Sequence, residues 1–160
     1  MDLRKPAVGR DLGIKADMGL SDLLSGKTDT NVFHQVEGAP NLSVITCGTI
    51  PPNPMELISS KRFANLLQSL RDRFTHIVID SPPTLPVSDS CVLAKMVDAT
   101  IVAVKAEETK ISMAKETITR LSKVNATITG VVLTQASPQK MSYYGEHYYQ
   151  DSYYGVEPSK

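Results

Sequence analysis

The chain has 160 residues, enough for one domain with a sizeable core, and 41% of them are apolar. Seventeen basic and seventeen acidic side chains cancel, which argues against binding to nucleic acid or to an anionic membrane through bulk charge. No apolar run approaches the ~20 residues that a membrane helix needs. Cys47 and Cys91 stand apart without metal-ligand spacing, so neither a disulfide framework nor a zinc site is expected. These features predict a cytoplasmic α/β domain.

The N-terminal third predicts short elements separated by loops. Residues 19–24 are expected to form a short helix that ends at Gly26. Residues 27–41 are polar and predict a loop, and residues 42–46 predict a short strand. Within the loop we expect a small helical patch made by Val32, Phe33 and Val36.

A clear helix start follows at Asn53, the expected N-cap, with Pro54 in the first helical position. Apolar residues then recur at helical spacing from Phe63 to Phe74. The pair Ser59-Ser60 is expected to divide this stretch into two helices.

Apolar runs and helical patterns alternate in the rest of the chain. The strands are expected at 76–80, 99–104 and 128–134, and the helices at 87–97 and 111–121. The Ser81-Pro82-Pro83 sequence must end the first of these strands, because proline cannot continue a ladder. Continuous Ile/Val strands between helices predict an α/β fold with a mainly parallel, doubly wound sheet covered on both faces.

Asp80 is the sharpest candidate for chemistry. It follows three β-branched residues at the carboxyl end of a predicted strand, where ligands bind in doubly wound sheets. An aspartate there can hold Mg²⁺ through its water shell, the Walker B pattern of nucleotide-hydrolysing proteins. The alternative is that Asp80 only caps the turn before the prolines.

A phosphate-binding loop of the form G-x-x-x-x-G-K-[ST] should accompany such an aspartate. The sole candidate is Gly26-Lys27-Thr28, but Ser21 stands where the first glycine should be and the preceding segment is helical in pattern. A helix C-cap at Gly26 explains these residues better. The three histidines cannot be paired with a serine or cysteine nucleophile from sequence.

The tyrosines are concentrated in one place. All six lie within twelve residues near the C-terminus, as doublets that repeat every five residues. Few aliphatic residues surround them, so residues 137–160 are expected to form a mobile tail and residues 1–136 the folded part. An RNA-stacking role is disfavoured because no lysine or arginine lies among them. The tyrosines are Tyr143, Tyr144, Tyr148, Tyr149, Tyr153 and Tyr154.

Together, several motifs resemble the cytoplasmic domain of bacterial tyrosine kinases, which serve capsule and exopolysaccharide export and are related to the deviant P-loop ATPases of chromosome partition. The resemblance covers nearly the whole chain. The motifs are, in chain order, Asp2-Leu3-Arg4-Lys5-Pro6, Gly19 to Gly26, Pro51 to Ile58, Ile77 to Pro83, Val87-Ser88-Asp89 and the tyrosine cluster.

The resemblance implies roles for particular residues. Asp2 corresponds to the second aspartate of the Walker A′ motif and Asp80 to the Walker B aspartate, so both are expected to serve the Mg²⁺ of bound ATP. Asp2 would also help to deprotonate the incoming tyrosine, and Arg4 would have a supporting role. The six tail tyrosines would be the phosphate acceptors, modified in trans by a neighbouring subunit of a ring.

The resemblance also implies what the chain lacks. The Walker A loop of the family precedes Walker A′, and Met1 falls inside Walker A′, so we expect a P-loop NTPase-like fold that is incomplete at the N-terminus. The parent sheet would lose a central strand and leave unpaired edges. ATP and Mg²⁺ binding are therefore doubtful, and the isolated chain is expected to be inactive.

Two functions stay open beside each other. The first is the C-terminal portion of an ATP-dependent tyrosine autokinase that regulates polysaccharide polymerisation and export. It would work with a ring of its own copies or a full-length kinase, and with a transmembrane co-polymerase at the inner face of the plasma membrane, but not with nucleic acid. The second is an inactive regulator that a full-length kinase phosphorylates. A partition-type ATPase relative is weaker, because that group has no need of a tyrosine-rich tail.

Overall fold

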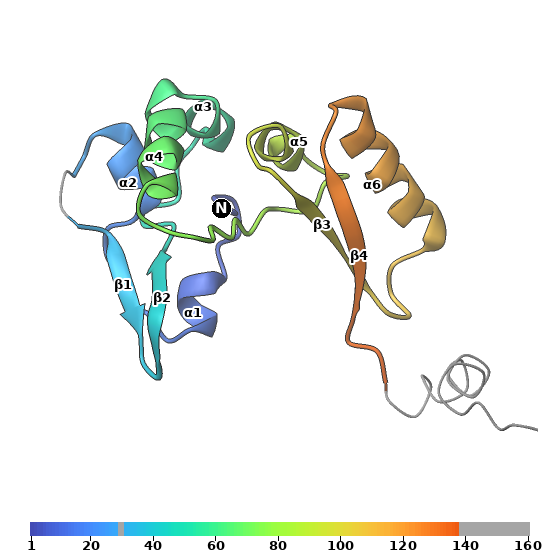
Figure 1. The fold of residues 1–160 in the computed structure, drawn as a ribbon, viewed down its shortest axis with the longest axis horizontal. Coiled ribbons are helices and arrows are strands. Elements are labelled where there is room, and N and C mark those ends of the chain that lie inside the picture. Colours follow the sequence, from blue (N-terminus) through green and yellow to red (C-terminus); the bar gives the residue numbers. More distant parts are fainter. Residues whose placement is uncertain (29–30, 138–160) are drawn as a thin grey trace, which may run out of the picture.

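The computed structural model describes residues 1–28 and 31–137, which contain both helices and strands (Figure 1). The tyrosine cluster lies outside the described residues. The elements, in chain order, are α1 (Val8–Asp11), α2 (Leu20–Ser25), β1 (Phe33–Val36), β2 (Ala39–Ile45), α3 (Pro54–Ile58), α4 (Lys61–Arg71), α5 (Asp89–Ala94), β3 (Thr100–Lys105), α6 (Ile111–Lys123) and β4 (Ile128–Thr134).

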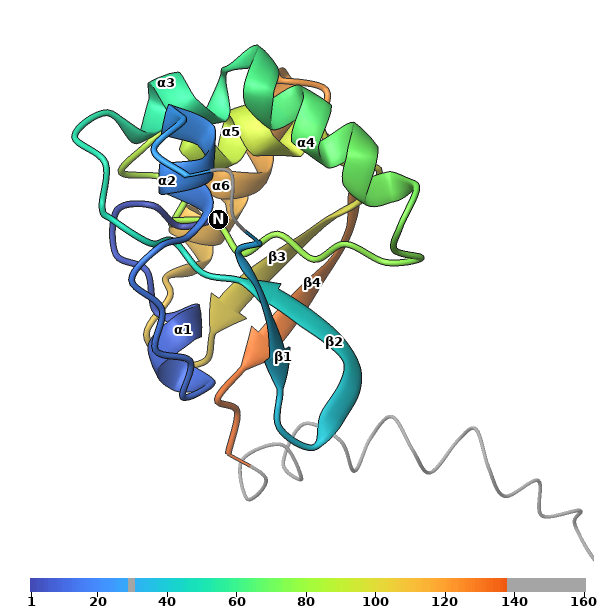
Figure 2. The same cartoon turned by 90° about the vertical axis from the view of Figure 1, so that its left-hand side faces the viewer.

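The parallel pair β3–β4 confirms the predicted α/β class. The two strands pair in parallel from Thr100↔Ile128 to Lys105↔Thr134 and are connected through α6 (Figure 2). Val102 of β3 packs with Ala94 of α5 and Leu121 of α6, so these helices cover one face. Neighbouring Ile101 points to the opposite face, where its side chain is 64% exposed. Helices were predicted on both faces of the sheet, but in the described part of the chain they cover one face of the β3–β4 pair only.

The expected helical patch around Phe33 is wrong. Residues 33–36 form β1, which pairs antiparallel with β2 and joins it through a tight turn. Gly38 in that turn has φ +77°, a conformation that glycine adopts without strain. Phe33 also stacks on Phe74 at a centroid distance of 5.9 Å. The apolar spacing of residues 32–36 fits a helix as well as a strand, and the cross-strand pairing and this ring contact favour the strand.

The prediction of a strand at residues 76–80 is wrong, because this segment forms no ladder with another described strand. Within the described residues the segment has no strand partner, and the side chain of Val78 is 94% exposed. A groove of about 1190 Å³ lies between this segment and β3. Apolar composition can specify an extended chain, but a strand also needs a neighbour to bond.

The main core gathers residues from distant parts of the sequence. Leu3 near the N-terminus, Ile58 of α3 and Phe63 of α4 are almost fully buried in it, together with Leu93 of α5. The predicted break between α3 and α4 is confirmed, since Ser60 accepts a hydrogen bond from the Phe63 N–H at 3.2 Å as an N-cap. This core fixes the N-terminal segment against α5.

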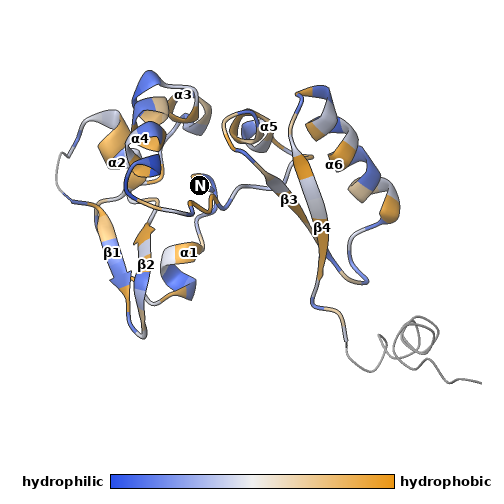
Figure 3. Ribbon diagram, viewed as in Figure 1, coloured by the Kyte–Doolittle hydropathy of each residue, from blue (hydrophilic) through white to orange (hydrophobic). Residues whose placement is uncertain are grey.

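Apolar side chains outside the two cores are also prominent. Figure 3 shows apolar stretches along β4, where Val131, Val132 and Leu133 are each about half exposed. Val78 and Ile101 line the groove, whereas these three residues of β4 do not.

Candidate functional site

Asp2 lies in a tight turn at the start of the chain. Its Oδ1 accepts hydrogen bonds from the backbone N–H groups of Arg4, at 2.8 Å, and Lys5, at 2.9 Å. Leu3, which lies between Asp2 and Arg4, is buried in the main core with 1% of its surface exposed. The core thus fixes the backbone of the turn, and the turn fixes the carboxylate.

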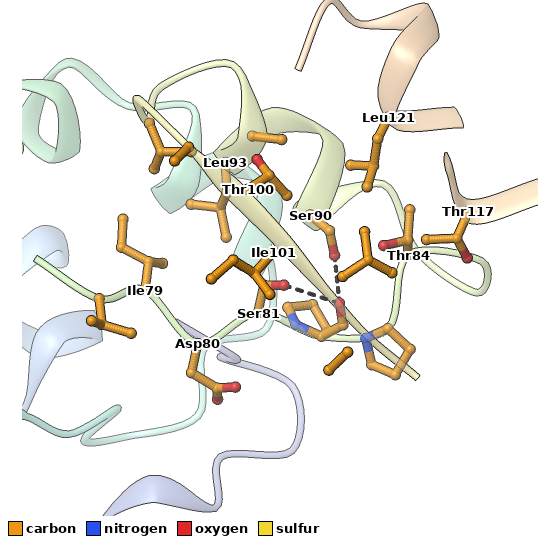
Figure 4. Close-up of a pocket in the computed structure, with 18 of the residues that line it drawn as sticks. Ile79, Asp80, Ser81, Thr84, Ser90, Leu93, Thr100, Ile101, Thr117 and Leu121 are labelled. Carbon is orange, nitrogen blue, oxygen red and sulfur yellow. Dashed lines mark hydrogen bonds between the residues drawn. The ribbon is translucent and has the colours of Figure 1, made fainter. Parts of the chain in front are cut away.

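Asp80 ends the extended segment that crosses the middle of the molecule. Ile79, the residue before it, packs partly against the main core. In Figure 4 the Asp80 carboxylate points away from the other labelled side chains of the groove. The loop that follows is fixed at the Pro82 carbonyl, which accepts hydrogen bonds from the Ser90 hydroxyl and, at 3.4 Å, from the Ser81 hydroxyl.

The two aspartates meet at one small cavity. Asp2, Asp80 and Thr46 all line a hollow of about 40 Å³ next to the N-terminal turn. The Thr46 hydroxyl is buried there without a hydrogen-bond partner in the described structure. Most of the other lining residues are apolar, so these three side chains are its main polar groups, and its size is enough for a water molecule. Sequence reasoning missed Thr46, because a threonine at the end of a strand carries no signal of its own.

Arg4, the third residue expected at the site, turns toward α5. Its guanidinium donates two hydrogen bonds of 2.8 Å to the two carboxylate oxygens of Asp89, which is completely buried. This bond and the charge of Asp89 raise the pKa of Arg4. Arg4 is therefore paired with Asp89 and does not line the cavity.

Gly26-Lys27-Thr28 does not form a phosphate loop. Gly26 has φ +74° and ends α2 as a left-handed C-cap, as the sequence predicts. The ammonium of Lys27 lies 3.9 Å from the carboxylate of Asp22 in the same helix. The N–H groups needed for a phosphate cradle are already used in closing the helix.

Asp22 is a buried carboxylate with a structural role. It accepts hydrogen bonds from the backbone N–H groups of Gly19, at 3.1 Å, and Thr49, at 3.0 Å. Burial by itself raises the pKa of Asp22, but these hydrogen bonds and the Lys27 ammonium outweigh it, so the pKa lies below its usual value. Asp22 thus joins the start of α2 to the loop after β2, beside Thr46.

Cys47 also borders the cavity, but its chemistry is unfavourable for a nucleophile. Burial raises the pKa of its thiol, and the negative charge of Asp22 raises it further. The reactive thiolate is thereby disfavoured.

The donor set suits a magnesium ion that keeps much of its water. In the described residues no group of three or more His, Cys, Asp or Glu side chains could hold a metal by itself. Mg²⁺ commonly binds through one or two carboxylates and fills its other positions with water and substrate phosphates. Asp2, Asp80 and the unpartnered Thr46 hydroxyl fit that pattern.

Comparison with known proteins adds an independent line of support. No established family profile matches the sequence. CapB of Staphylococcus aureus, named as a tyrosine-protein kinase, is 34% identical over 94% of this chain. The solved kinase domain of VpsO is 38% identical, superposes with a TM-score of 0.80, and is matched over 68% of its length by 85% of this chain. The chain belongs to the bacterial tyrosine kinases.

A further tyrosine kinase domain, that of ETK from Escherichia coli, has 29% identity and a TM-score of 0.77. That match includes 85% of this bacterial tyrosine kinase chain and 55% of the ETK domain. It spans 66% of CapB and 18% of full-length E. coli Etk. It thus corresponds to part of a kinase domain, with the P-loop NTPase-like α/β fold of that family.

Proposed function

We propose that this chain forms part of an ATP-dependent protein-tyrosine kinase of exopolysaccharide or capsule production. The observation that carries the proposal is the meeting of Asp2 and Asp80 at one small cavity. These residues are 78 positions apart, and both were expected from sequence to serve the same metal. The similarity to kinase domains of known structure supports this assignment.

Asp2 and Asp80 would hold Mg²⁺, and the ion would neutralise charge on the phosphates of bound ATP. Phosphoryl transfer depends on position and charge neutralisation more than on covalent chemistry of the protein. Arg4 supports the Asp2 turn through its bond to Asp89. Asp2 would also accept the proton of the attacking tyrosine hydroxyl.

The acceptors in this proposal are the six tyrosines at 143–154. Each phosphate adds about −1.5 to −2 charge, so six would add roughly −9 to −12 to a formally neutral chain. That charge would repel neighbouring copies and loosen a ring of subunits. The proposed partners are other copies of the chain or a complete kinase.

The proposed location is the cytoplasmic face of the plasma membrane, next to a transmembrane co-polymerase of the polysaccharide. None of the helices in residues 1–28 and 31–137 has the length and apolar character of a membrane span. Association with the membrane would then depend on another segment or protein.

A phosphorylated regulator without activity of its own is the second candidate. It is favoured by one observation: the 160 residues contain no G-x-x-x-x-G-K-[ST] loop to hold the β- and γ-phosphates. We therefore expect the purified chain to form no phosphotyrosine with ATP and Mg²⁺. Strong autophosphorylation would contradict this expectation.

One reconstitution experiment separates the two candidates. The chain is mixed with a fragment of a related kinase that carries Walker A but stops before Walker A′, and phosphotyrosine is measured on the tail. Activity that is lost in Asp2→Asn and Asp80→Asn, but kept in Asp72→Asn, supports a kinase portion. Phosphorylation only by an intact kinase, equal in all three variants, supports the regulator. Asp72 is an exposed residue at the end of α4.

A further inference from the structure

Two adjacent residues at the start of α5 reach the two loops that carry the candidate metal-binding aspartates. Asp89 is fully buried and binds Arg4, two positions after Asp2. Ser90, 6% exposed, donates its hydroxyl to the carbonyl of Pro82, two positions after Asp80. Figure 4 shows the Ser90 bond from α5 to the loop.

We propose that Asp89 and Ser90 are positioning residues that hold the Asp2 turn and the Asp80 loop in one fixed arrangement. The proposal rests on the proposed function, since it assigns to this pair the geometry of the metal site. Neither side chain lines the cavity itself. Their effect on the site passes through Arg4 and Pro82.

The physical need for such a device follows from charge. Two carboxylates at one cavity repel each other, and the Met1 α-amino group, which interacts with both, offsets part of that repulsion without holding either loop in a set direction. A bidentate guanidinium–carboxylate pair fixes both distance and orientation, because the guanidinium is planar and its donors are rigidly spaced. Helix α5 is held in turn by Leu93 in the main core. Both loops are thus held by α5, which is itself anchored in the main core.

A simpler role for Asp89 is available, because an acidic residue in the first turn of a helix stabilises that helix. That role predicts uniform loosening of α5 when the charge is removed. The positioning role instead predicts a change at a particular loop. The two roles therefore differ in where the effect appears.

Amide hydrogen exchange of the 160-residue chain, resolved by residue, tests the positioning role without any metal. In Asp89→Asn we expect the protection of the Arg4 and Lys5 amides, which donate to Asp2, to fall about tenfold more than that of the core amides. Arg4→Lys should act in the same way and leaves the buried carboxylate with a cation. Asp98→Asn is the matched control, because it breaks the exposed pair with Arg71. Equal acceleration over the whole chain, or none, would overturn the proposal.

Manganese binding gives the second readout, with Mn²⁺ added alone and paramagnetic line broadening as the signal. In the wild type we expect amides beside both Asp2 and Asp80 to broaden together. In Asp89→Asn and Ser90→Ala the affinity should fall about tenfold, the usual cost of losing an outer partner of a metal ligand. Wild-type affinity in both variants would overturn the positioning role. Absence of broadening in the wild type would instead contradict the proposed metal site, while the exchange result still decides the positioning.

Discussion

The guanidinium of Arg4 and the carboxylate of Asp89 are joined by two hydrogen bonds of 2.8 Å, across 85 positions of sequence. The pair connects the N-terminal turn with the helix that follows the Asp80 loop. Asp89 is completely buried, whereas Arg4 remains partly in contact with water. A buried carboxylate of this kind depends on its partner for compensation of its charge.

Removal of Arg4 should therefore destabilise the fold more than removal of a comparable surface arginine. In Arg4→Ala the Asp89 carboxylate stays buried without its cation. In Arg71→Ala the Asp98 carboxylate, 86% exposed, remains hydrated. We expect a clearly larger fall of the thermal midpoint for Arg4→Ala, measured by circular dichroism. Equal falls in the two variants would show that the Asp89 pair has no special weight.

Asp22 should make stability depend on pH in acid. Its pKa is lower in the folded chain than the ~3.9 of an unfolded aspartate. Its charged form therefore contributes stability above that unfolded value, and the contribution is lost as the pH falls through the folded pKa. Asp22→Asn should lower the free energy of unfolding by about 2 kcal/mol at pH 7, the scale of hydrogen bonds to a charged group.

Urea titrations of both proteins at several pH values test this. The difference between wild type and Asp22→Asn should shrink as the pH falls below about 4. A difference that is independent of pH would show that the hydrogen bonds, and not the charge, are responsible. Asp17→Asn, at an exposed position, serves as the control for the loss of one negative charge.

Gly48 should tolerate no side chain, because it lies against the start of α2. Its φ is +73°, and an added Cβ would lie 2.2 Å from Asp22 Oδ2 and 2.3 Å from the Gly19 nitrogen. Gly38 has a similar φ of +77° but nothing within 4 Å of such a Cβ, so it is the matched control. We expect a loss of about 1 kcal/mol for Gly38→Ala and about 2–4 kcal/mol for Gly48→Ala in chemical unfolding. Equal losses would mean that the loop has room to move.

The apolar borders of the groove should promote self-association. Val78 and Ile101 are 94% and 64% exposed, and the segment that carries Val78 joins no sheet among residues 1–28 and 31–137. Unpaired, apolar edges readily bind another chain. We expect Val78→Lys and Ile101→Lys to reduce the association seen in sedimentation velocity. Gln68→Lys on the exposed side of α4 adds the same charge elsewhere and should leave it unchanged.

Local sequence patterns predicted most of the helices and strands of residues 53–134. The break between α3 and α4 at Ser59-Ser60 and the C-cap at Gly26 depend on neighbours within a few positions, so their signals lie in the sequence itself. The error at Phe33 has the opposite cause. Its strand depends on pairing with Ile45 and on stacking with Phe74, and neither contact can be deduced from residues 32–36 alone.

For the site, the motifs of the chain indicated which residues to look for: an aspartate resembling that of Walker A′, an aspartate after an apolar run, and a tyrosine cluster resembling phosphate acceptors. That Asp2 and Asp80 share a cavity with Thr46, and that Arg4 turns to Asp89, emerged from the three-dimensional fold. The fold also left residues 76–80 without a ladder to any described strand. One cause explains both outcomes: the chemistry of a side chain belongs to a single residue, whereas convergence and pairing require partners that are distant in sequence.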